Sequence, residues 1–354
     1  MNKIRVLVVD DSVTVRKYLA EIIQTNPQFE LVGEAEDGKR AIELTERLRP
    51  DVISLDMILP VMSGLTATEY IMAYFPTPIL VVSSSTNRGE LFKTYDALSA
   101  GAVDVLEKVA DIANKNWPAE YLAALKRVSR IKVITHPRAR MHLSPAAAKD
   151  KPASQAPAPS SQYQYVAIGA STGGPAAVIR VLTGLPSDFP LPIFLLIHIG
   201  APFGYALADW LDGLSPIRVA VAADGDPLPQ PGRPKVILAP HERHLIVEKG
   251  HLHLHDGPER FSCKPSVDVL FESIAKEIGR VTIACLLTGM GRDGGRGMLA
   301  IRKAGGMTLA QNETTCTVFG MPREAIDLGA AQQVLSLDEF APTLLALAGR
   351  GRFA

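Results

Sequence analysis

The sequence predicts an α/β protein of two domains, each built on a doubly wound parallel sheet with helices on both faces. Short runs of continuous apolar residues alternate with amphipathic stretches, and this alternation occurs twice along the chain. Strands that are apolar throughout are typical of parallel sheets, because helices cover both of their faces. The length of 354 residues suits two domains, each large enough to bury its own core.

The first series of strands and helices occupies the N-terminal third of the chain. Apolar runs with a strand pattern stand at 4–9, 51–55, 78–83 and 102–106. Apolar residues at helical spacing mark the stretches at 15–24, 39–48 and 117–132. Strands that alternate with helices in this way indicate βαβ units. We therefore expect a parallel-sheet domain over residues 1–125.

A long segment of different composition separates the two series. Residues 137–164 are rich in Ala, Pro and Ser and have almost no large apolar side chains. Such a segment cannot bury enough apolar surface to offset the entropy lost when its backbone is ordered. We expect a helix end and a flexible linker over 126–163, in preference to an irregular packed loop, and a second domain over 164–349.

The second series restarts directly after this segment. Its apolar runs stand at 165–170, 192–199, 235–240, 281–289 and 307–311. The stretch GHLHLH at 250–255 alternates instead, which indicates a solvent-facing strand of a small antiparallel hairpin. Its three histidines fit a polar hairpin face better than a metal site, because no further ligand pattern accompanies them.

The composition argues against nucleic-acid and membrane partners. Lys and Arg number 37 together, as do Asp and Glu, so the net charge is zero. No run reaches the about 18 apolar residues that a membrane-spanning helix needs, and the N-terminus lacks the pattern of a signal peptide. Three widely spaced cysteines indicate a reducing compartment. We therefore expect a cytoplasmic protein with no membrane insertion and no nucleic-acid partner.

Acidic, hydroxyl and ammonium side chains stand at the strand ends of the first predicted sheet. Asp10 and Asp11 follow its first strand, and Asp56, Ser83 and Lys108 stand at the ends of three later strands. Parallel strands share one carboxyl edge, so these side chains should meet there. Clustered carboxylates need a cation, and Mg²⁺ suits such a set. Helix caps and surface charges would explain single members, but not their recurrence at successive strand ends.

This set of residues resembles the receiver domain of response regulators, a flavodoxin-like doubly wound fold, over roughly residues 1–125. The resemblance implies that Asp56 is the phosphoacceptor and that Asp10, Asp11 and Asp56 bind Mg²⁺. It also implies that Ser83 and Lys108 sense the phosphoryl group.

Two positions depart from the pattern of that family. Val109 follows the lysine where the family usually has proline, and Val105 stands where it usually has an aromatic residue that reorients on activation. Both positions bear on how phosphorylation is transmitted and not on the acceptor chemistry.

The first turn of the second domain carries the pattern G-x-S-x-G around Ser171. The stretch GASTGGP at 169–175 follows an apolar strand and precedes an amphipathic helix. A tight turn of this kind exposes the serine hydroxyl and brings the backbone N–H groups of a helix N-terminus near it. Taken alone, the pattern also fits a nucleotide-phosphate loop or a simple turn.

Two further residues complete a hydrolytic set with this serine. A serine nucleophile needs a base, and the base needs a carboxylate to orient it. His198 stands at the end of the next strand, and Asp293 follows the run at 281–289. All three therefore lie at strand ends, where a parallel sheet gathers them. Their order along the chain, Ser–His–Asp, disfavours the α/β-hydrolase fold.

Together these stretches resemble the catalytic domain of the CheB family, the chemotaxis-receptor methylesterases. The matching stretches are IGASTGG, LIH, KPSVDVLF, LLTGMGRDGG and FGMPREA. The resemblance implies that Ser171 is the nucleophile, His198 the general base and then acid, and Asp293 the residue that orients His198. Thr172 and Met290 match flanking positions, and Met290 is expected to lend a backbone N–H to the oxyanion hole.

The resemblance also implies the reaction and the partners. The expected substrate is a glutamate methyl ester on the cytoplasmic helices of a methyl-accepting chemoreceptor, and some members of the family also deamidate glutamine. A histidine kinase of the chemotaxis type is the expected phosphodonor, and no cofactor is expected in the catalytic domain. We expect the unphosphorylated receiver to cover the crevice around Ser171 and phosphorylation of Asp56 to loosen this contact.

Two other functions stay open at this point. The family commonly has Met-Pro after its histidine, whereas this chain has Ile199 and Gly200 there. One alternative is therefore a serine hydrolase of the same mechanism that acts on a substrate other than a chemoreceptor. The other is a non-catalytic signalling scaffold, against which the complete set of serine, histidine and aspartate argues.

Overall fold

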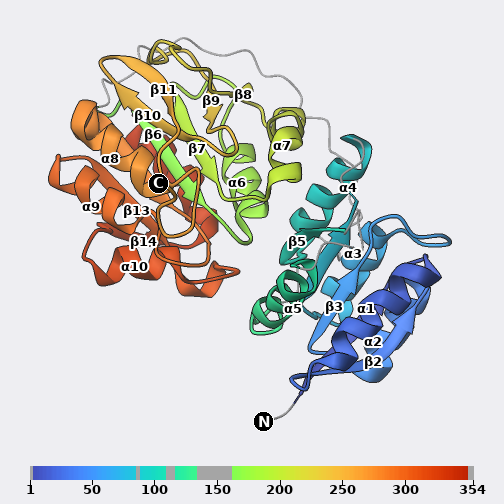
Figure 1. Cartoon of the computed structure of the whole chain (residues 1–354). Coiled ribbons are helices and arrows are strands. Elements are labelled where there is room, and N and C mark those ends of the chain that lie inside the picture. Colours follow the sequence, from blue (N-terminus) through green and yellow to red (C-terminus); the bar gives the residue numbers. More distant parts are fainter. Residues whose placement is uncertain (1–2, 85–87, 109–115, 134–161, 350–354) are drawn as a thin grey trace. The chain divides into compact units, whose positions relative to one another are not determined.

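The computed structural model describes residues 3–84, 88–108, 116–133 and 162–349. The chain divides into two compact units, Met1–Ala146 and Ala147–Ala354 (Figure 1). Residues 134–161, which make up most of the predicted linker, lie outside the described part. None of the helices within the described ranges combines the length and apolar character needed to cross a bilayer.

The first unit is a parallel sheet of five strands in the order β2-β1-β3-β4-β5. The strands are β1 (Ile4–Val9), β2 (Phe29–Ala35), β3 (Val52–Leu55), β4 (Ile79–Ser83) and β5 (Asp104–Glu107). The helices are α1 (Val13–Thr25), α2 (Gly38–Leu48), α3 (Gly64–Tyr74), α4 (Arg88–Ser99) and α5 (Trp117–Val128). The strand order reverses at β1, which confirms the predicted doubly wound topology.

Helices cover both faces of this sheet. Leu19 of α1 and Tyr121 of α5 pack against Val8 of β1 in one buried cluster. Side chains alternate along a strand, so Leu7 points to the opposite face, where it lies beside Leu44 of α2. Burial of each such aliphatic side chain contributes about 1.5–3 kcal/mol to folding. The two-sided cover explains why the strands read as continuous apolar runs.

Strand β2 was not predicted from the sequence. It lies at the edge of the sheet, and only Phe29 and Ala35 at its two ends are buried. A strand with one neighbour and partly exposed faces lacks the apolar run that marks the central strands. Its sequence, FELVGEA, therefore carries a weak signal.

The second unit is a parallel sheet of seven strands in the order β14-β13-β12-β6-β7-β9-β8. The strands are β6 (Tyr165–Ala170), β7 (Ile193–Ile197), β8 (Val219–Val221), β9 (Val236–Leu238), β12 (Thr282–Leu286), β13 (Met307–Gln311) and β14 (Gln333–Leu335). A separate antiparallel hairpin joins β10 (His244–Glu248) to β11 (His251–His255). Both the parallel sheet and the small hairpin confirm the predicted fold class.

The strand order of this sheet reverses at β6, which lies between β12 and β7. The helices are α6 (Gly174–Thr183), α7 (Ala201–Leu214), α8 (Val267–Glu277), α9 (Gly295–Lys303), α10 (Met321–Asp327) and α11 (Phe340–Leu347). Ala170 of β6 is paired with Ile197 of β7, and Gly169 is paired with Leu286 of β12. The ends of these three strands therefore form one edge at the topological switch point, where α/β folds bind ligands.

Candidate functional site

The predicted acidic residues meet at the carboxyl edge of the first sheet. Val9 and Leu55 are paired in β1 and β3, so Asp10 and Asp56, which follow them, are neighbours. Together with Asp11 they offer carboxylate oxygens that all lie within 4.8 Å of one another. Asp10 and Asp56 are buried, whereas Asp11 is exposed.

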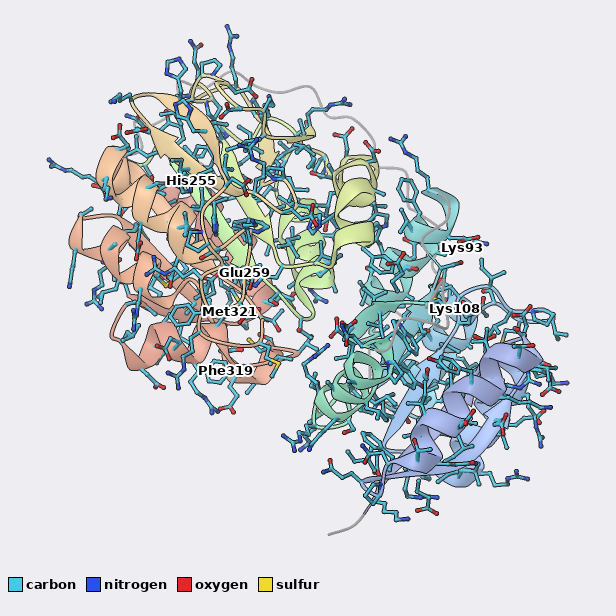
Figure 2. All side chains as sticks on the ribbon, in the orientation of Figure 1. Lys93, Lys108, His255, Glu259, Phe319 and Met321 are labelled. Carbon is cyan, nitrogen blue, oxygen red and sulfur yellow. The ribbon has the colours of Figure 1, made fainter. Side chains whose placement is uncertain are left out.

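Lys108, labelled in Figure 2, follows β5, and its side chain reaches the carboxylates of Asp10 and Asp56. Its Nζ lies 2.7 Å from Oδ2 of Asp10 and 2.7 Å from Oδ2 of Asp56. Its backbone N–H donates to the carbonyl of Ser83 at 2.9 Å, which aligns the ends of β5 and β4. The buried Ser83 hydroxyl points to the carbonyl of Ser84 at 3.5 Å. Within the described residues it bonds neither Asp56 nor Lys108.

Burial and charge oppose each other in this cluster. Burial raises the pKa of Asp56 and of Asp10, and Lys108 offsets this only in part. Burial alone would lower the pKa of Lys108, but the two carboxylates outweigh it and raise that pKa. Lys108 therefore stays protonated at neutral pH. Oxygens from three carboxylates beside one ammonium group fit a divalent cation of the Mg²⁺ type.

Of the two positions that depart from the receiver pattern, the structure describes one. Val105 lies in β5 and is partly buried. Val109 lies outside the described residues.

Ser171 lies in a tight turn between β6 and α6. Its carbonyl accepts a hydrogen bond from the N–H of Gly174 at 2.6 Å. Gly173 has a φ of 75°, which favours glycine, and Pro175 stands at the start of α6. These local features produce the predicted turn and leave the Ser171 side chain partly exposed.

A second turn, which follows β12, holds the serine turn in place. The N–H of Ser171 donates to the carbonyl of Thr288 at 3.0 Å, and the Thr288 hydroxyl donates to the carbonyl of Thr172 at 3.0 Å. A Cβ atom on Gly289 would lie 2.8 Å from Cβ of Ser171 and 2.3 Å from Sδ of Met321. Only glycine therefore allows the two turns to approach this closely.

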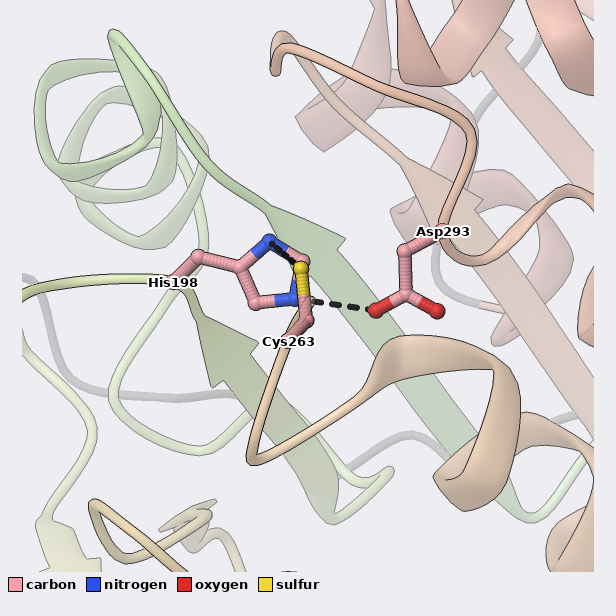
Figure 3. A group of neighbouring side chains, drawn as sticks. All are labelled: His198, Cys263 and Asp293. Atoms are coloured by element: carbon pink, nitrogen blue, oxygen red, sulfur yellow. Dashed lines mark hydrogen bonds and ion pairs between the residues drawn. The ribbon is translucent and has the colours of Figure 1, made fainter. Parts of the chain in front are cut away.

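His198 and Asp293 form a direct hydrogen bond beside this turn (Figure 3). His198 follows β7, and its N–H donates to the carbonyl of Ala170 at 3.0 Å. Its ring Nε2 lies 2.9 Å from Oδ2 of Asp293, which is only 1% exposed. The sequence thus placed these two residues correctly at one sheet edge, although 95 positions separate them along the chain.

The N-terminus of α8 fixes the Asp293 carboxylate. Oδ1 accepts from the hydroxyl of Ser266 at 2.7 Å and from the N–H of Asp268 at 3.0 Å, and Oδ2 accepts from the N–H of Val267 at 2.7 Å. Burial alone would raise the pKa of Asp293, but the hydrogen bonds from His198, Asp268 and Ser266 lower it. Asp293 is therefore ionised at neutral pH.

The sequence reasoning missed two members of this arrangement. Ser266 caps α8 by accepting from the N–H of Val269, and a serine that precedes an apolar helical run is a signal that could have revealed it. Cys263 lies on the other side of the imidazole, with Sγ 3.7 Å from Nδ1 of His198. No local pattern marks a contact between residues 65 positions apart.

The two neighbours of His198 also set its charge. Burial alone would lower the pKa of His198, but hydrogen bonds with Asp293 and Cys263 raise it to about 9. Within the described residues, the Ser171 hydroxyl makes no hydrogen bond to His198. The two residues directly follow the strand pair Ala170–Ile197. Because Asp293 occupies Nε2, the nitrogen left for a nucleophile is Nδ1.

The two predicted flanking residues lie in the two turns just described. Thr172 follows Ser171, and its carbonyl accepts from Thr288. Met290 follows Gly289, and the residue is 52% exposed. The part of Met290 in an oxyanion hole stays a prediction, as do the catalytic roles of Ser171, His198 and Asp293.

Comparisons with known proteins agree over nearly the whole chain. The family model described as CheB methylesterase matches residues 166–344, and the response regulator receiver domain model matches residues 6–114. A Pseudomonas aeruginosa protein named protein-glutamate methylesterase/protein-glutamine glutaminase 2 is 44% identical over 98% of this chain and 97% of its own length. A protein of the same name from Anaeromyxobacter dehalogenans is 42% identical over 95% of this chain and 94% of its own length.

Among solved structures, the crystal structure of the Thermotoga maritima CheB methylesterase catalytic domain is 35% identical, with a TM-score of 0.49. The match covers 52% of this chain and 98% of that structure. The two family models identify a receiver domain and a methylesterase domain, and the relatives that match nearly the full length bear the name of the methylesterase. The chain therefore belongs to the CheB methylesterase family and carries a response regulator receiver domain ahead of its methylesterase domain.

Proposed function

We propose that this protein is a phosphorylation-regulated methylesterase that hydrolyses glutamate methyl esters on the cytoplasmic helices of a chemoreceptor. The observation that carries the proposal is the hydrogen bond between His198 and Asp293, 2.9 Å long, beside the turn that leaves Ser171 partly exposed. The relatives bear the names of a protein-glutamate methylesterase and a protein-glutamine glutaminase. We extend both activities to this chain.

In the first half of the reaction, Ser171 is the nucleophile. Its oxygen attacks the ester carbonyl while its proton passes to Nδ1 of His198, which stays ordered because Asp293 holds Nε2. Backbone N–H groups of the turn that follows Ser171 and of Met290 stabilise the oxyanion. His198 then protonates the departing methoxide, and methanol leaves an acyl-enzyme.

In the second half, water replaces methanol. His198 takes a proton from water, the hydroxide attacks the acyl carbonyl, and Ser171 leaves with the proton that His198 returns. The product is a glutamate carboxylate on the receptor. With glutamine as the substrate, the same steps release ammonia in place of methanol. Either product adds a negative charge to a helix surface, where like charges at helical spacing disfavour association.

The rate of hydrolysis is expected to rise with pH up to about 9. His198 accepts a proton only in its neutral form, and Asp293 and Cys263 together raise its pKa to about 9. Below this value, kcat/KM for methanol release should increase about tenfold per pH unit. The measurement is methanol release from methylated receptor by phosphorylated enzyme, with the Ser171→Ala variant supplying the rate of alkaline background hydrolysis. A plateau that begins below about pH 7 would contradict the assignment of His198.

In the receiver, we propose that Asp56 accepts a phosphoryl group from a histidine kinase of the chemotaxis type. Asp10, Asp11 and Asp56 would hold Mg²⁺, which neutralises charge on the phosphoryl group when it is bound. Lys108, already 2.7 Å from Asp56, pairs with the new negative charge, and the Ser83 hydroxyl turns to a phosphoryl oxygen. Supporting observations are the clustered carboxylates and the ammonium group among them.

Replacing Asp56 with asparagine is expected to abolish phosphorylation and the activation that depends on it. An amide oxygen is a poor nucleophile, so no aspartyl phosphate forms. The measurement is transfer of labelled phosphate from the kinase, followed by methanol release with and without kinase. Asp37→Asn is the matched control, because Asp37 caps α2 by accepting from the N–H of Arg40 and asparagine caps helices equally well. Activation that survives in Asp56→Asn would contradict the proposal.

We further propose that the unphosphorylated receiver restricts access to Ser171 and that phosphorylation relieves the restriction. The proposal rests on the two separate compact units and on the segment of chain that joins them. The idea fails if deletion of residues 1–135 leaves the unstimulated rate of hydrolysis unchanged.

A further inference from the structure

The nitrogen of His198 that should serve Ser171 faces a cysteine instead. Asp293 occupies Nε2, and Sγ of Cys263 lies 3.7 Å from Nδ1 (Figure 3). No hydroxyl group in the described part of the chain is bonded to Nδ1. The three side chains therefore form a Cys–His–Asp array in which the carboxylate and the thiol contact different nitrogens of one imidazole.

The position of Cys263 is fixed by a short turn ahead of α8. Its N–H donates to the carbonyl of Arg260 at 2.9 Å, and the N–H of Arg260 donates back at 3.1 Å. The two residues between them, Phe261 and Ser262, have positive φ values of 51° and 59°, as in a tight hairpin turn. The Arg260 guanidinium is anchored in turn by two hydrogen bonds to Glu272 of α8. The backbone hydrogen bonds of this turn and the Arg260–Glu272 pair thus hold the thiol beside the imidazole.

Such an array suits thiol chemistry. A thiol beside an imidazole can pass its proton to the ring, and the carboxylate on the other nitrogen stabilises the imidazolium that results. The thiolate that remains is the form that reacts with electrophiles. Cys263 is partly exposed, so small molecules can reach it.

The other two cysteines lack these features. Cys285 is fully buried inside β12. Burial raises the pKa of Cys316 to about 12, so its thiol stays protonated at neutral pH. Cys263 is therefore the cysteine whose thiol contacts an imidazole, and Cys285 and Cys316 serve as controls for thiol reactivity within the same chain.

We propose that Cys263 is a modification site for small electrophiles such as hydrogen peroxide, and that its modification silences His198. The reactivity of the thiol stands on its own geometry, whereas the loss of hydrolysis rests on the proposed function of His198. Cys263 is not the nucleophile for the ester, because that role belongs to Ser171.

With peroxide, the reaction balances without a further reactant. The Cys263 thiolate attacks one oxygen of hydrogen peroxide, an S–O bond forms and the O–O bond breaks. The sulfur loses two electrons, the peroxide gains them, and the hydroxide that leaves takes the proton from His198 to become water. The sulfenic acid then lies against Nδ1, where it competes with Ser171 for the base. A thiol reductant returns the sulfur to its starting state.

The first test measures the thiol and needs no receptor. The full chain is treated with iodoacetamide at about pH 7, and the labelling rate of each cysteine is followed by peptide mass spectrometry. Cys263 is expected to react at least about tenfold faster than Cys316, and His198→Asn should remove this advantage. Ser171→Ala should leave it intact. Cys285 reports on folding, because it stays unlabelled in a folded chain.

Two results of this labelling would contradict the proposal that Cys263 is a reactive thiol. One is a rate for Cys263 no greater than that of Cys316, which decides the matter even if His198→Asn does not fold. The other is an equal rate for Cys263 in the wild-type chain and in folded His198→Asn. Because Ser171→Ala is predicted to be inactive yet still labelled, the outcome does not depend on whether the chain is a methylesterase.

The second test measures the consequence for hydrolysis. Peroxide should abolish methanol release by the wild-type chain and by Cys316→Ser, and dithiothreitol should restore it. Cys263→Ala should keep its own untreated rate after the same treatment. Equal loss in Cys263→Ala would overturn the assignment of the effect to this thiol. Rapid labelling of Cys263 with unchanged hydrolysis would overturn the silencing of His198, while the reactive thiol would stand.

Discussion

Replacing Ser171 with alanine is expected to reduce methanol release from methylated receptor by at least about ten-thousand-fold. The substitution removes the oxygen proposed to form the acyl-enzyme, while the turn that carries it is held by backbone groups. Those bonds join the Ser171 N–H to Thr288 and the Ser171 carbonyl to Gly174, and alanine keeps both. The fold should therefore be unchanged, and thermal unfolding of the variant checks this.

The matched control for this experiment is Thr314→Ala. It also removes one hydroxyl from the catalytic unit, in the short 3₁₀ helix Glu313–Thr315, where the Thr314 hydroxyl bonds Asn312 and no other described side chain, and its rate should stay within a few-fold of wild type. The measurement is methanol released per enzyme at saturating phosphorylation. Full activity in Ser171→Ala would rule out the mechanism and revive the scaffold alternative. If Ser171 proves essential but methylated chemoreceptors are not hydrolysed, the other alternative, a different substrate, would be favoured.

Replacing Asp293 with asparagine is expected to lower kcat by about a thousandfold to ten-thousandfold. Four donors converge on this carboxylate, from His198, Ser266 and the N–H groups of Val267 and Asp268. Asparagine offers one oxygen and one NH₂ group, so at least one donor must face another donor. The imidazole then loses the partner that holds its tautomer and stabilises its charged form.

The pH profile of the Asp293→Asn variant separates this role from a loss of folding. Burial favours the neutral imidazole, and Asp293 is the largest cause that raises the pKa of His198. Removing its charge should therefore lower that pKa, so the rising limb of residual activity moves to lower pH while the maximal rate falls. A rate that falls with an unmoved limb would contradict the proposed contact between the two side chains.

Asp268→Asn is the matched control for Asp293→Asn. Asp268 is equally buried at the start of α8, but its side chain bonds the N–H of Gly297 and does not touch His198. Burial raises its pKa to about 6, so an uncharged amide resembles a form that the native carboxyl readily adopts. We expect a modest loss of stability and a loss of kcat below about tenfold. A loss equal to that of Asp293→Asn would show that any buried charge in this region is essential.

The α/β fold class and the candidate residues at the strand ends could be predicted from the sequence. Central strands of a parallel sheet are buried on both faces, so their apolar runs are visible in the sequence, and polar residues that follow them must share one edge. Asp56, Ser171 and Asp293 could be assigned to an edge for this reason. The edge strand β2 escaped prediction because its partly exposed faces leave no such run.

Which atoms face one another became visible in the folded structure. It showed that Asp293 binds Nε2 of His198, that the N-terminus of α8 holds that carboxylate, and that Cys263 lies at Nδ1. These contacts join loops far apart in the chain, and anchors such as the Arg260–Glu272 pair fix their geometry. The periodicity of apolar residues indicates the helix or strand to which a residue belongs. It carries no information about which distant loop packs against the side chain of that residue.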